Sequence, residues 1–174
     1  MPSIFLVGPM GAGKTTVGRR LAETLRREFL DSDLMIEQRA GVGIPLIFEL
    51  EGEAGFRARE KALIAELTQR PDVVLATGGG AVLDPDNRRW LAGRGLVVYL
   101  CATVDEQLRR TCGDDSRPLL QTADPRARLA QLFTQRDPLY RGVADLIIHS
   151  DGQTLRAIVQ QIFDHLAPEV ARHR

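Results

Sequence analysis

The segment that most constrains the fold is residues 8–15, which read G-P-M-G-A-G-K-T and match the pattern G-x-x-x-x-G-K-[ST]. A short apolar run, 3–7, precedes it and is typical of a buried parallel strand. The segment 16–27 follows and places its apolar side chains on one helical face. A strand, a glycine-rich turn and a helix in this order direct backbone N–H groups at a phosphate chain. We therefore predict a phosphate-binding loop, in which Lys14 contacts the β- and γ-phosphates of a nucleotide and the Thr15 hydroxyl ligates Mg²⁺.

Apolar strands alternate with amphipathic helices along the rest of the chain. The expected strands are 3–7, 28–33, 73–77, 96–100 and 146–148. The expected helices are 16–27, 34–39, 54–69, 84–92, 104–110, 126–135 and 154–166. This alternation predicts an α/β fold in the form of a three-layer αβα sandwich, in which helices cover both faces of a parallel five-stranded sheet. Ligands of such folds bind at the carboxyl ends of the strands.

The composition narrows the class of protein. With 174 residues, 44% of them hydrophobic, the chain is expected to form a single domain, 1–174, around one core. Its net charge of zero predicts no general attraction to nucleic acid or to a membrane surface. The two cysteines form no C-x-x-C motif and the three histidines show no ligand spacing, so structural zinc and a disulfide framework are not expected. No signal peptide or membrane-spanning run is visible, so we expect a cytoplasmic protein, and we further expect a monomer.

Polar and glycine residues follow the second and third expected strands. Asp31 and Asp33 end the second strand, and beside a phosphate-binding loop one carboxylate can act on Mg²⁺ through water while the other accepts a hydrogen bond from a substrate hydroxyl. The alternative is that one of them only caps the following helix. The glycines at 78–80 follow the third strand, and three in succession are costly in backbone entropy. They therefore favour a backbone that touches a substrate, with a bare tight turn as the alternative.

Three arginines are candidates for contacts with anions. Arg57 lies at the start of a helix, where a cation is unfavourable unless an anion is bound nearby. Arg117 lies in the polar stretch 111–124, which glycines and prolines interrupt and which we predict to be a mobile lid. Arg136 is expected at a helix end, where a simple C-terminal cap is the alternative.

These segments together resemble the shikimate kinases, small P-loop kinases related in fold to the nucleoside monophosphate kinases. The resemblance covers about residues 4–153 and rests on G-P-M-G-A-G-K-T-T-V-G-R, D-S-D, I-P-L-I-F-E-L-E-G-E-A-G-F-R-A-R-E, T-G-G-G-A-V, R-P-L-L and R-D-P-L-Y. It implies a P-loop kinase sheet with a helical substrate-binding segment at about 33–60 and a lid at about 111–124. It also implies ATP-dependent phosphorylation of the shikimate 3-hydroxyl, in the route to chorismate and aromatic amino acids.

The resemblance implies that one group of residues holds ATP and Mg²⁺. The residues implied to bind ATP are Gly11, Ala12, Gly13, Lys14, Thr15, Thr16, Arg110, Arg117 and Gln153. Of these, Arg110 and Gln153 would flank the adenine, and Arg117 would come down with the lid onto the phosphates. Thr15 would ligate Mg²⁺, and Asp31 would act on the ion through bound water.

A second group is implied to bind shikimate. Asp33 would bind the ring hydroxyls and is the candidate for the catalytic base. Arg57 and Arg136 would clamp the carboxylate, because planar guanidinium groups match carboxylate geometry, and the Gly79 backbone would touch the substrate. The residues implied to be catalytic are Lys14, Asp33 and Arg117.

Two rival interpretations are weighed against this one. A kinase acting on gluconate or on a nucleoside monophosphate would share the loop, but it would not need D-S-D, G-G-G and R-D-P-L-Y together. A non-catalytic nucleotide-binding switch would also share it, although a GTP-specific switch would usually carry an N-K-x-D segment, and the sequence contains none.

Overall fold

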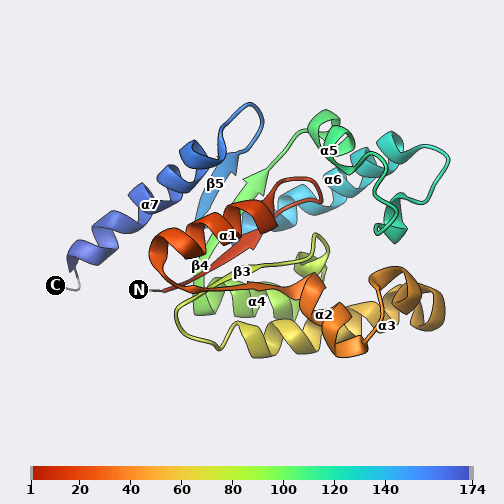
Figure 1. The fold of residues 1–174 in the computed structure, drawn as a ribbon, viewed down its shortest axis with the longest axis horizontal. Helices are drawn as coiled ribbons and strands as arrows, with labels where there is room; N and C mark the ends of the chain where they lie inside the picture. Colours follow the sequence, from red (N-terminus) through yellow and green to blue (C-terminus); the bar gives the residue numbers. More distant parts are fainter. Residues whose placement is uncertain (1, 173–174) are drawn as a thin grey trace.

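A parallel five-stranded sheet forms the middle layer of the protein, seen here in a computed structural model that describes residues 2–172 (Figure 1). The strands are β1 (Ser3–Val7), β2 (Glu28–Asp31), β3 (Val73–Ala76), β4 (Gly95–Cys101) and β5 (Leu146–His149). Their order is β2-β3-β1-β4-β5, and each neighbouring pair is parallel. The predicted parallel sheet is therefore confirmed, and β1 lies at its centre.

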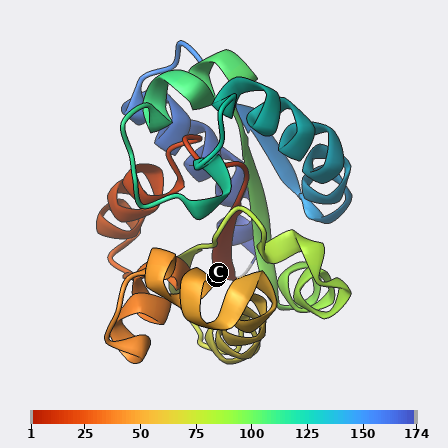
Figure 2. The same ribbon diagram turned by 90° about the vertical axis from the view of Figure 1, so that its right-hand side faces the viewer.

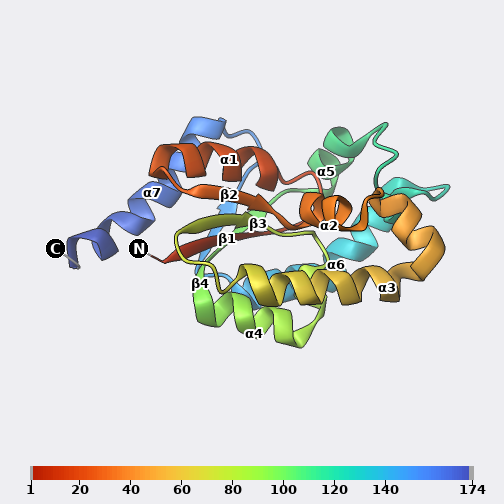
Figure 3. The same ribbon diagram turned by 60° about the horizontal axis from the view of Figure 1, so that its bottom comes forward.

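Helices cover both faces of the sheet, as the alternation predicts. They are α1 (Lys14–Leu25), α2 (Ser32–Ala40), α3 (Ile44–Leu67), α4 (Pro85–Arg94), α5 (Val104–Thr111), α6 (Pro125–Val143) and α7 (Leu155–Arg172), with 3₁₀ turns η1 (Ala81–Leu83) and η2 (Pro118–Leu120). Figure 3 shows α1 and α7 on one side of the sheet and α3, α4 and α6 on the other. The three-layer sandwich is confirmed.

The alternation of side chains along β1 explains why two cores form. Ile4 and Leu6 point to the face covered by α1 and α7, whereas Phe5 and Val7 point to the face covered by α3, α4 and α6. All four side chains are fully buried. A strand buried on both faces needs a continuous apolar run, and this is the pattern that identifies β1 in the sequence.

Helix α6 differs most from its expected bounds. It was expected to end at residue 135, but it continues through Pro138 to Val143. A proline inside a helix removes one backbone hydrogen bond and usually breaks the helix. Here the turn beyond Pro138 places Tyr140 and Val143 in the core, and this packing keeps the helix intact. Arg136 consequently lies within α6 and not at its end.

Helix α3 begins at Ile44, ten residues before the helix expected at 54–69. Gly52 interrupts it with φ 71° and ψ 179°, a conformation that is essentially confined to glycine. The following segment buries Phe56, Leu63 and Leu67, as the helical pattern predicts. Figure 2 shows α2 and α3 (orange) on one side of the molecule and the lid segment (green to teal) on the other. No helix in the described range 2–172 is both long and apolar enough to cross a membrane.

Candidate active site

A pocket of about 530 Å³ lies at the carboxyl ends of β1, β2 and β3. It brings together twelve of the residues predicted for the site: Gly11, Gly13, Lys14, Thr15, Thr16, Asp31, Asp33, Arg57, Gly79, Arg110, Arg117 and Arg136. Ala12 is buried within the loop and does not line the pocket, and Gln153 lies outside the pocket. The pocket stands where a parallel α/β sheet is expected to bind its ligand.

The phosphate-binding loop is formed as its glycines predict. Gly13 takes a left-handed conformation with φ 91° and leads directly into α1, whose first turn carries no acidic side chain. Backbone N–H groups at such a helix start favour an anion. The Lys14 ammonium donates hydrogen bonds to the carbonyl oxygens of Gly8 and Pro9, both at 2.8 Å. Desolvation, followed by the charge of Arg117, lowers the pKa of Lys14 to about 8 against the opposing effect of Asp33 and Asp31.

Asp31 connects the loop to the next helix. Its Oδ2 accepts a hydrogen bond from the Thr15 hydroxyl at 2.7 Å. Its Oδ1 accepts from the backbone N–H groups of Asp33 and Leu34, so that Asp31 is also the N-cap of α2. The capping role that the sequence offers as an alternative is therefore confirmed for Asp31, and its second carboxylate oxygen lies beside the loop.

Asp33 does not end a strand, as expected, but lies in the first turn of α2. The strand stops at Asp31, because the capping hydrogen bonds turn the chain into the helix at that point. The Oδ1 atom of Asp33 is out of solvent, and within residues 2–172 it has no hydrogen-bond partner. Burial, followed by the charge of Asp31, raises the pKa of Asp33, while Lys14 and the arginines oppose this shift.

Arg57 is held by two acids, neither of which is among the predicted site residues. Its guanidinium donates to Glu60 Oε2 at 2.8 Å and to Glu53 Oε1 at 3.2 Å. These carboxylates offset its charge, so the helix-dipole argument for a bound anion at Arg57 is not needed. Glu60 is 1% exposed, and burial raises its pKa although Arg57 lowers it. Its spacing of three residues from Arg57 is the signal that could have identified it.

The glycine turn approaches these acidic and basic groups closely. A Cβ atom on Gly78 would lie 2.6 Å from Asp33 Oδ1 and 2.8 Å from Glu60 Oε1. A Cβ atom on Gly80 would overlap the guanidinium of Arg57. A side chain at Gly78 or Gly80 would therefore have to displace Asp33, Glu60 or Arg57 from its position beside the turn.

Arg136 reaches the same turn from α6. It is 4% exposed, and its Nε has no partner among the described residues. A guanidinium nitrogen lies 3.6 Å from the position of a Cβ on Gly79. Burial lowers its pKa. Because α6 continues to Val143, the alternative interpretation of Arg136 as a helix cap is wrong.

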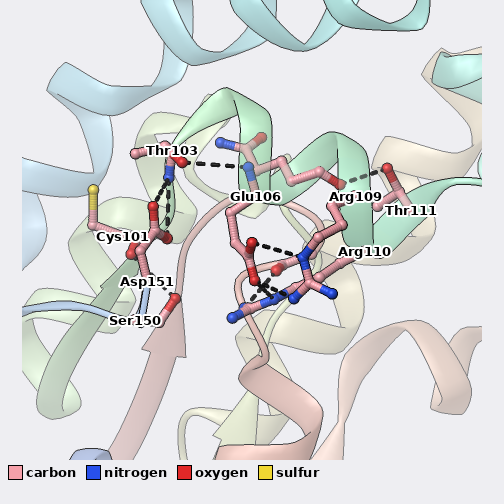
Figure 4. Close-up of polar contacts among 10 residues, drawn as sticks. Cys101, Thr103, Glu106, Arg109, Arg110, Thr111, Ser150 and Asp151 are labelled. Atoms are coloured by element: carbon pink, nitrogen blue, oxygen red, sulfur yellow. Dashed lines mark hydrogen bonds and ion pairs between the residues drawn. The ribbon is translucent and has the colours of Figure 1, made fainter. Parts of the chain in front are cut away.

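Of the remaining candidates, Arg110 and Arg117 line the pocket and Gln153 does not. Arg117 donates to Asp114 Oδ2 at 3.0 Å within the lid segment. Arg110 donates to the Gly11 carbonyl oxygen at 2.9 Å and to Glu106 Oε1 at 2.6 Å (Figure 4). Gln153 donates instead to the His149 carbonyl oxygen. The structure thus brings Arg110 to the loop but does not bring Gln153 to it.

The lid segment is more ordered than the loop predicted for 111–124. It contains the 3₁₀ turn η2, in which Leu120 is buried against Leu129 and Leu132 of α6. The segment is therefore anchored at one point, with polar stretches on either side of that anchor.

Comparison with known proteins gives a family match over most of the chain. The model of the shikimate kinase family, described as "SKI: Shikimate kinase", matches residues 10–167. A shikimate kinase of Halorhodospira halophila is 60% identical over 94% of this chain and 92% of its own length. The structure of an Acinetobacter baumannii shikimate kinase in complex with shikimate has a TM-score of 0.95 at 53% identity, and the match covers 97% of this chain and 94% of that one.

A more distant likeness concerns the fold alone. A gluconokinase from Sinorhizobium meliloti has a TM-score of 0.59 at 17% identity, over 98% of this chain and 94% of its own. At this identity the likeness shows that the two proteins share a fold and nothing more. From the extent of the family match and the identity to its members, this chain belongs to the shikimate kinase family.

Proposed function

We propose that this protein transfers the γ-phosphoryl group of ATP to the 3-hydroxyl of shikimate, in the route to chorismate and aromatic amino acids. The observation that carries the proposal is a single pocket in which a phosphate-binding loop faces an acidic group and two arginines, Arg57 and Arg136. The A. baumannii relative that holds shikimate supports the same acceptor.

The nucleotide side of the pocket would bind the triphosphate of ATP. The N–H groups at the start of α1 would face its oxygens, and Lys14 would exchange the Gly8 and Pro9 carbonyls for the β- and γ-phosphates. When the lid closes, Arg117 would release its hydrogen bond to Asp114 and contact the transferring phosphate instead. Arg110 already touches the loop and would lie beside the base.

The pair formed by Thr15 and Asp31 fits a magnesium ion. Mg²⁺ prefers oxygen ligands and is usually bound through one or two protein groups, together with phosphates and water. The Thr15 hydroxyl and the Asp31 carboxylate supply such oxygens 2.7 Å apart beside the loop. When bound, the ion neutralises charge on the β- and γ-phosphate oxygens. Thr15 would ligate the ion directly, and Asp31 would contact the ion through a bound water molecule.

The acceptor side of the pocket would bind shikimate through the carboxylate and the hydroxyl groups of this substrate. Arg57 and Arg136 would bind the carboxylate, and the Gly79 backbone would contact the ring. Asp33 would accept a hydrogen bond from the reacting hydroxyl and take up its proton as the oxygen bonds to phosphorus and ADP leaves. Phosphoryl transfer also depends on alignment and charge neutralisation, so Asp33 would orient the hydroxyl as well as take up its proton. We further propose a cytoplasmic monomer as the working form.

The test is ADP release from Mg·ATP with shikimate, gluconate and AMP offered separately. ADP release with shikimate alone supports the proposal. Release with gluconate or AMP and not with shikimate would keep the nucleotide site but overturn the acceptor. If ATP bound and no acceptor stimulated turnover, the nucleotide-binding switch would become the better interpretation.

A further inference from the structure

Tyr140 lies behind the acceptor pocket in a position that the proposed function does not use. It stands on α6 one turn beyond Arg136, and residues four apart share one side of a helix. Its side chain is 1% exposed, and it does not line the pocket. Its hydroxyl donates a hydrogen bond to the carbonyl oxygen of Gly79. The same helix side therefore carries a proposed ligand of the substrate and a contact to a backbone that would touch the substrate.

The hydrogen bond from Tyr140 holds the middle of the glycine turn. The ends of the turn are fixed separately, because the Gly78 N–H donates to the Ser32 hydroxyl at 3.0 Å and the Ala81 N–H donates to the Gly78 carbonyl at 3.1 Å. The peptide unit after Gly79 is planar, so a fixed Gly79 carbonyl also fixes the direction of the Gly80 N–H. Glycine lacks a side chain to restrain its backbone, and an outside contact must supply this restraint.

The chemistry of the contact suits a permanent support. Burial raises the pKa of Tyr140 to about 12, against the lowering effect of the Arg136 charge. The phenol therefore remains protonated throughout the pH range in which enzymes work, and it remains a donor to the carbonyl. The hydrogen bond from Tyr140 to the glycine turn is therefore kept when nearby acids titrate.

We propose that Tyr140 is a positioning residue for the acceptor site, which holds the Gly79 backbone at a fixed place relative to Arg136. It acts through Gly79 and does not touch the substrate. This inference rests on the proposed function, since it concerns the same acceptor. Its consequence is that the hydroxyl of Tyr140 strengthens shikimate binding and leaves ATP binding unchanged.

Tyr99 provides a matched control. Its ring packs against that of Tyr140, with the ring centroids 4.9 Å apart, and it too is fully buried. Its hydroxyl donates to Asp137 Oδ1 at 2.6 Å and has no contact with the glycine turn. Tyr99→Phe therefore removes a buried phenolic hydrogen bond from the same aromatic pair without releasing Gly79.

The experiment compares steady-state kinetics and thermal melting of wild type, Tyr140→Phe and Tyr99→Phe. We expect Tyr140→Phe to raise the KM for shikimate about three- to tenfold, which is the range for one net hydrogen bond. The KM for ATP should stay within about twofold, and Tyr99→Phe should leave both KM values unchanged. Incorporation of 4-fluorophenylalanine at position 140 fills the space of the hydroxyl without a donor, and it should reproduce the effect even if the phenylalanine variant folds poorly.

Failure of the positioning role of Tyr140 can be distinguished from failure of the proposed function. Equal shikimate KM values in wild type and both position-140 variants would overturn the positioning role and leave the proposed function standing. A rise in the KM for ATP as large as that for shikimate would also overturn it, because a general loosening would then explain the result. Wild-type protein that releases no ADP with shikimate would instead remove the proposed function and, with it, this inference.

Discussion

Asp33 is subject to two opposing demands. Burial favours its neutral form, whereas accepting a proton from a hydroxyl requires its charged form. A carboxyl whose pKa is raised on folding stabilises the folded state below its unfolded pKa of about 3.9, and this stabilisation is lost as the pH rises through the folded value. At neutral pH Asp33 therefore lowers the free energy of unfolding of the ligand-free protein.

Asp33→Asn should separate these demands. We expect turnover with shikimate to fall by at least about a hundredfold, since general-base contributions are typically of this size or larger. The melting temperature at pH 7 should rise, by about 2–4 °C for each kcal/mol gained in a chain of this size. The rise should shrink as the pH is lowered toward 4. Near-normal turnover in the variant would refute the assignment of Asp33, as measured by coupled ADP release.

Arg136 should act on the acceptor and not on the nucleotide. A hydrogen bond to a charged group is worth about 1.5–3 kcal/mol, so Arg136→Ala should raise the KM for shikimate by about ten- to a hundredfold. Arg141→Ala is the matched control, because Arg141 lies on the same helix and pairs with Asp137 outside the pocket. If Arg136→Ala raised the KM for ATP instead, the arginine would belong to the nucleotide site.

At the scale of the elements, the interruption of α3 positions the proposed carboxylate clamp. Gly52 changes the direction of the chain just before the segment that carries Arg57, and it does so with a backbone conformation that other residues rarely adopt. No atom would clash with a Cβ there, so any penalty for a side chain would come from the backbone. The position of Arg57 thus depends on the backbone conformation of a single residue, Gly52.

Gly52→Ala should show this link. We expect a loss of about 1–3 kcal/mol in stability from backbone strain, and a raised KM for shikimate as the segment shifts. Gly142→Ala is the control, because Gly142 is an exposed helical glycine with open space around it, and alanine there should gain up to about 1 kcal/mol. Urea unfolding and kinetics measure both. A Gly52→Ala variant as stable and active as Gly142→Ala would exclude the link.

The elements also illustrate what the sequence can predict. Strand β1, the loop and α1 follow from an apolar run, glycines and helical periodicity, which are all local patterns. The end of α6 could not be predicted, because local rules stop a helix at Pro138 and only packing of Tyr140 in the core carries it further. The burial of Glu60 was missed for the same reason, since glutamate on a helix ordinarily faces water.

At the scale of the whole molecule, the pocket is lined by residues beside the sheet and by residues of the segment 111–124. The loop and the glycine turn directly follow strands β1 and β3, while Arg117 lies on a segment anchored through Leu120 to α6. The polar stretches on either side of this anchor carry few buried side chains. Such segments open easily and can move without disturbing the sheet.

Hydrogen exchange should detect this closure. We expect amides in the segment 111–124 to exchange more slowly with Mg·ADP and shikimate bound than in the ligand-free protein, with Leu120 changing least. Amides of β1 and β4 provide the internal control, because buried central strands should be protected in both states. Identical exchange of the lid segment with and without ligands would refute a mobile lid.

The scarcity of lysine has a consequence for inhibitor chemistry. Lys14 and Lys61 are the only lysines in the chain. Lys61 pairs with Asp84 and Asp86, which raise its pKa, so its amine is protonated and a poor nucleophile. Lys14 has a pKa of about 8 and lines the pocket, so a substantial fraction of its amine is free at mildly alkaline pH. An electrophile that enters the pocket would therefore acylate one lysine selectively, with ATP as its natural competitor.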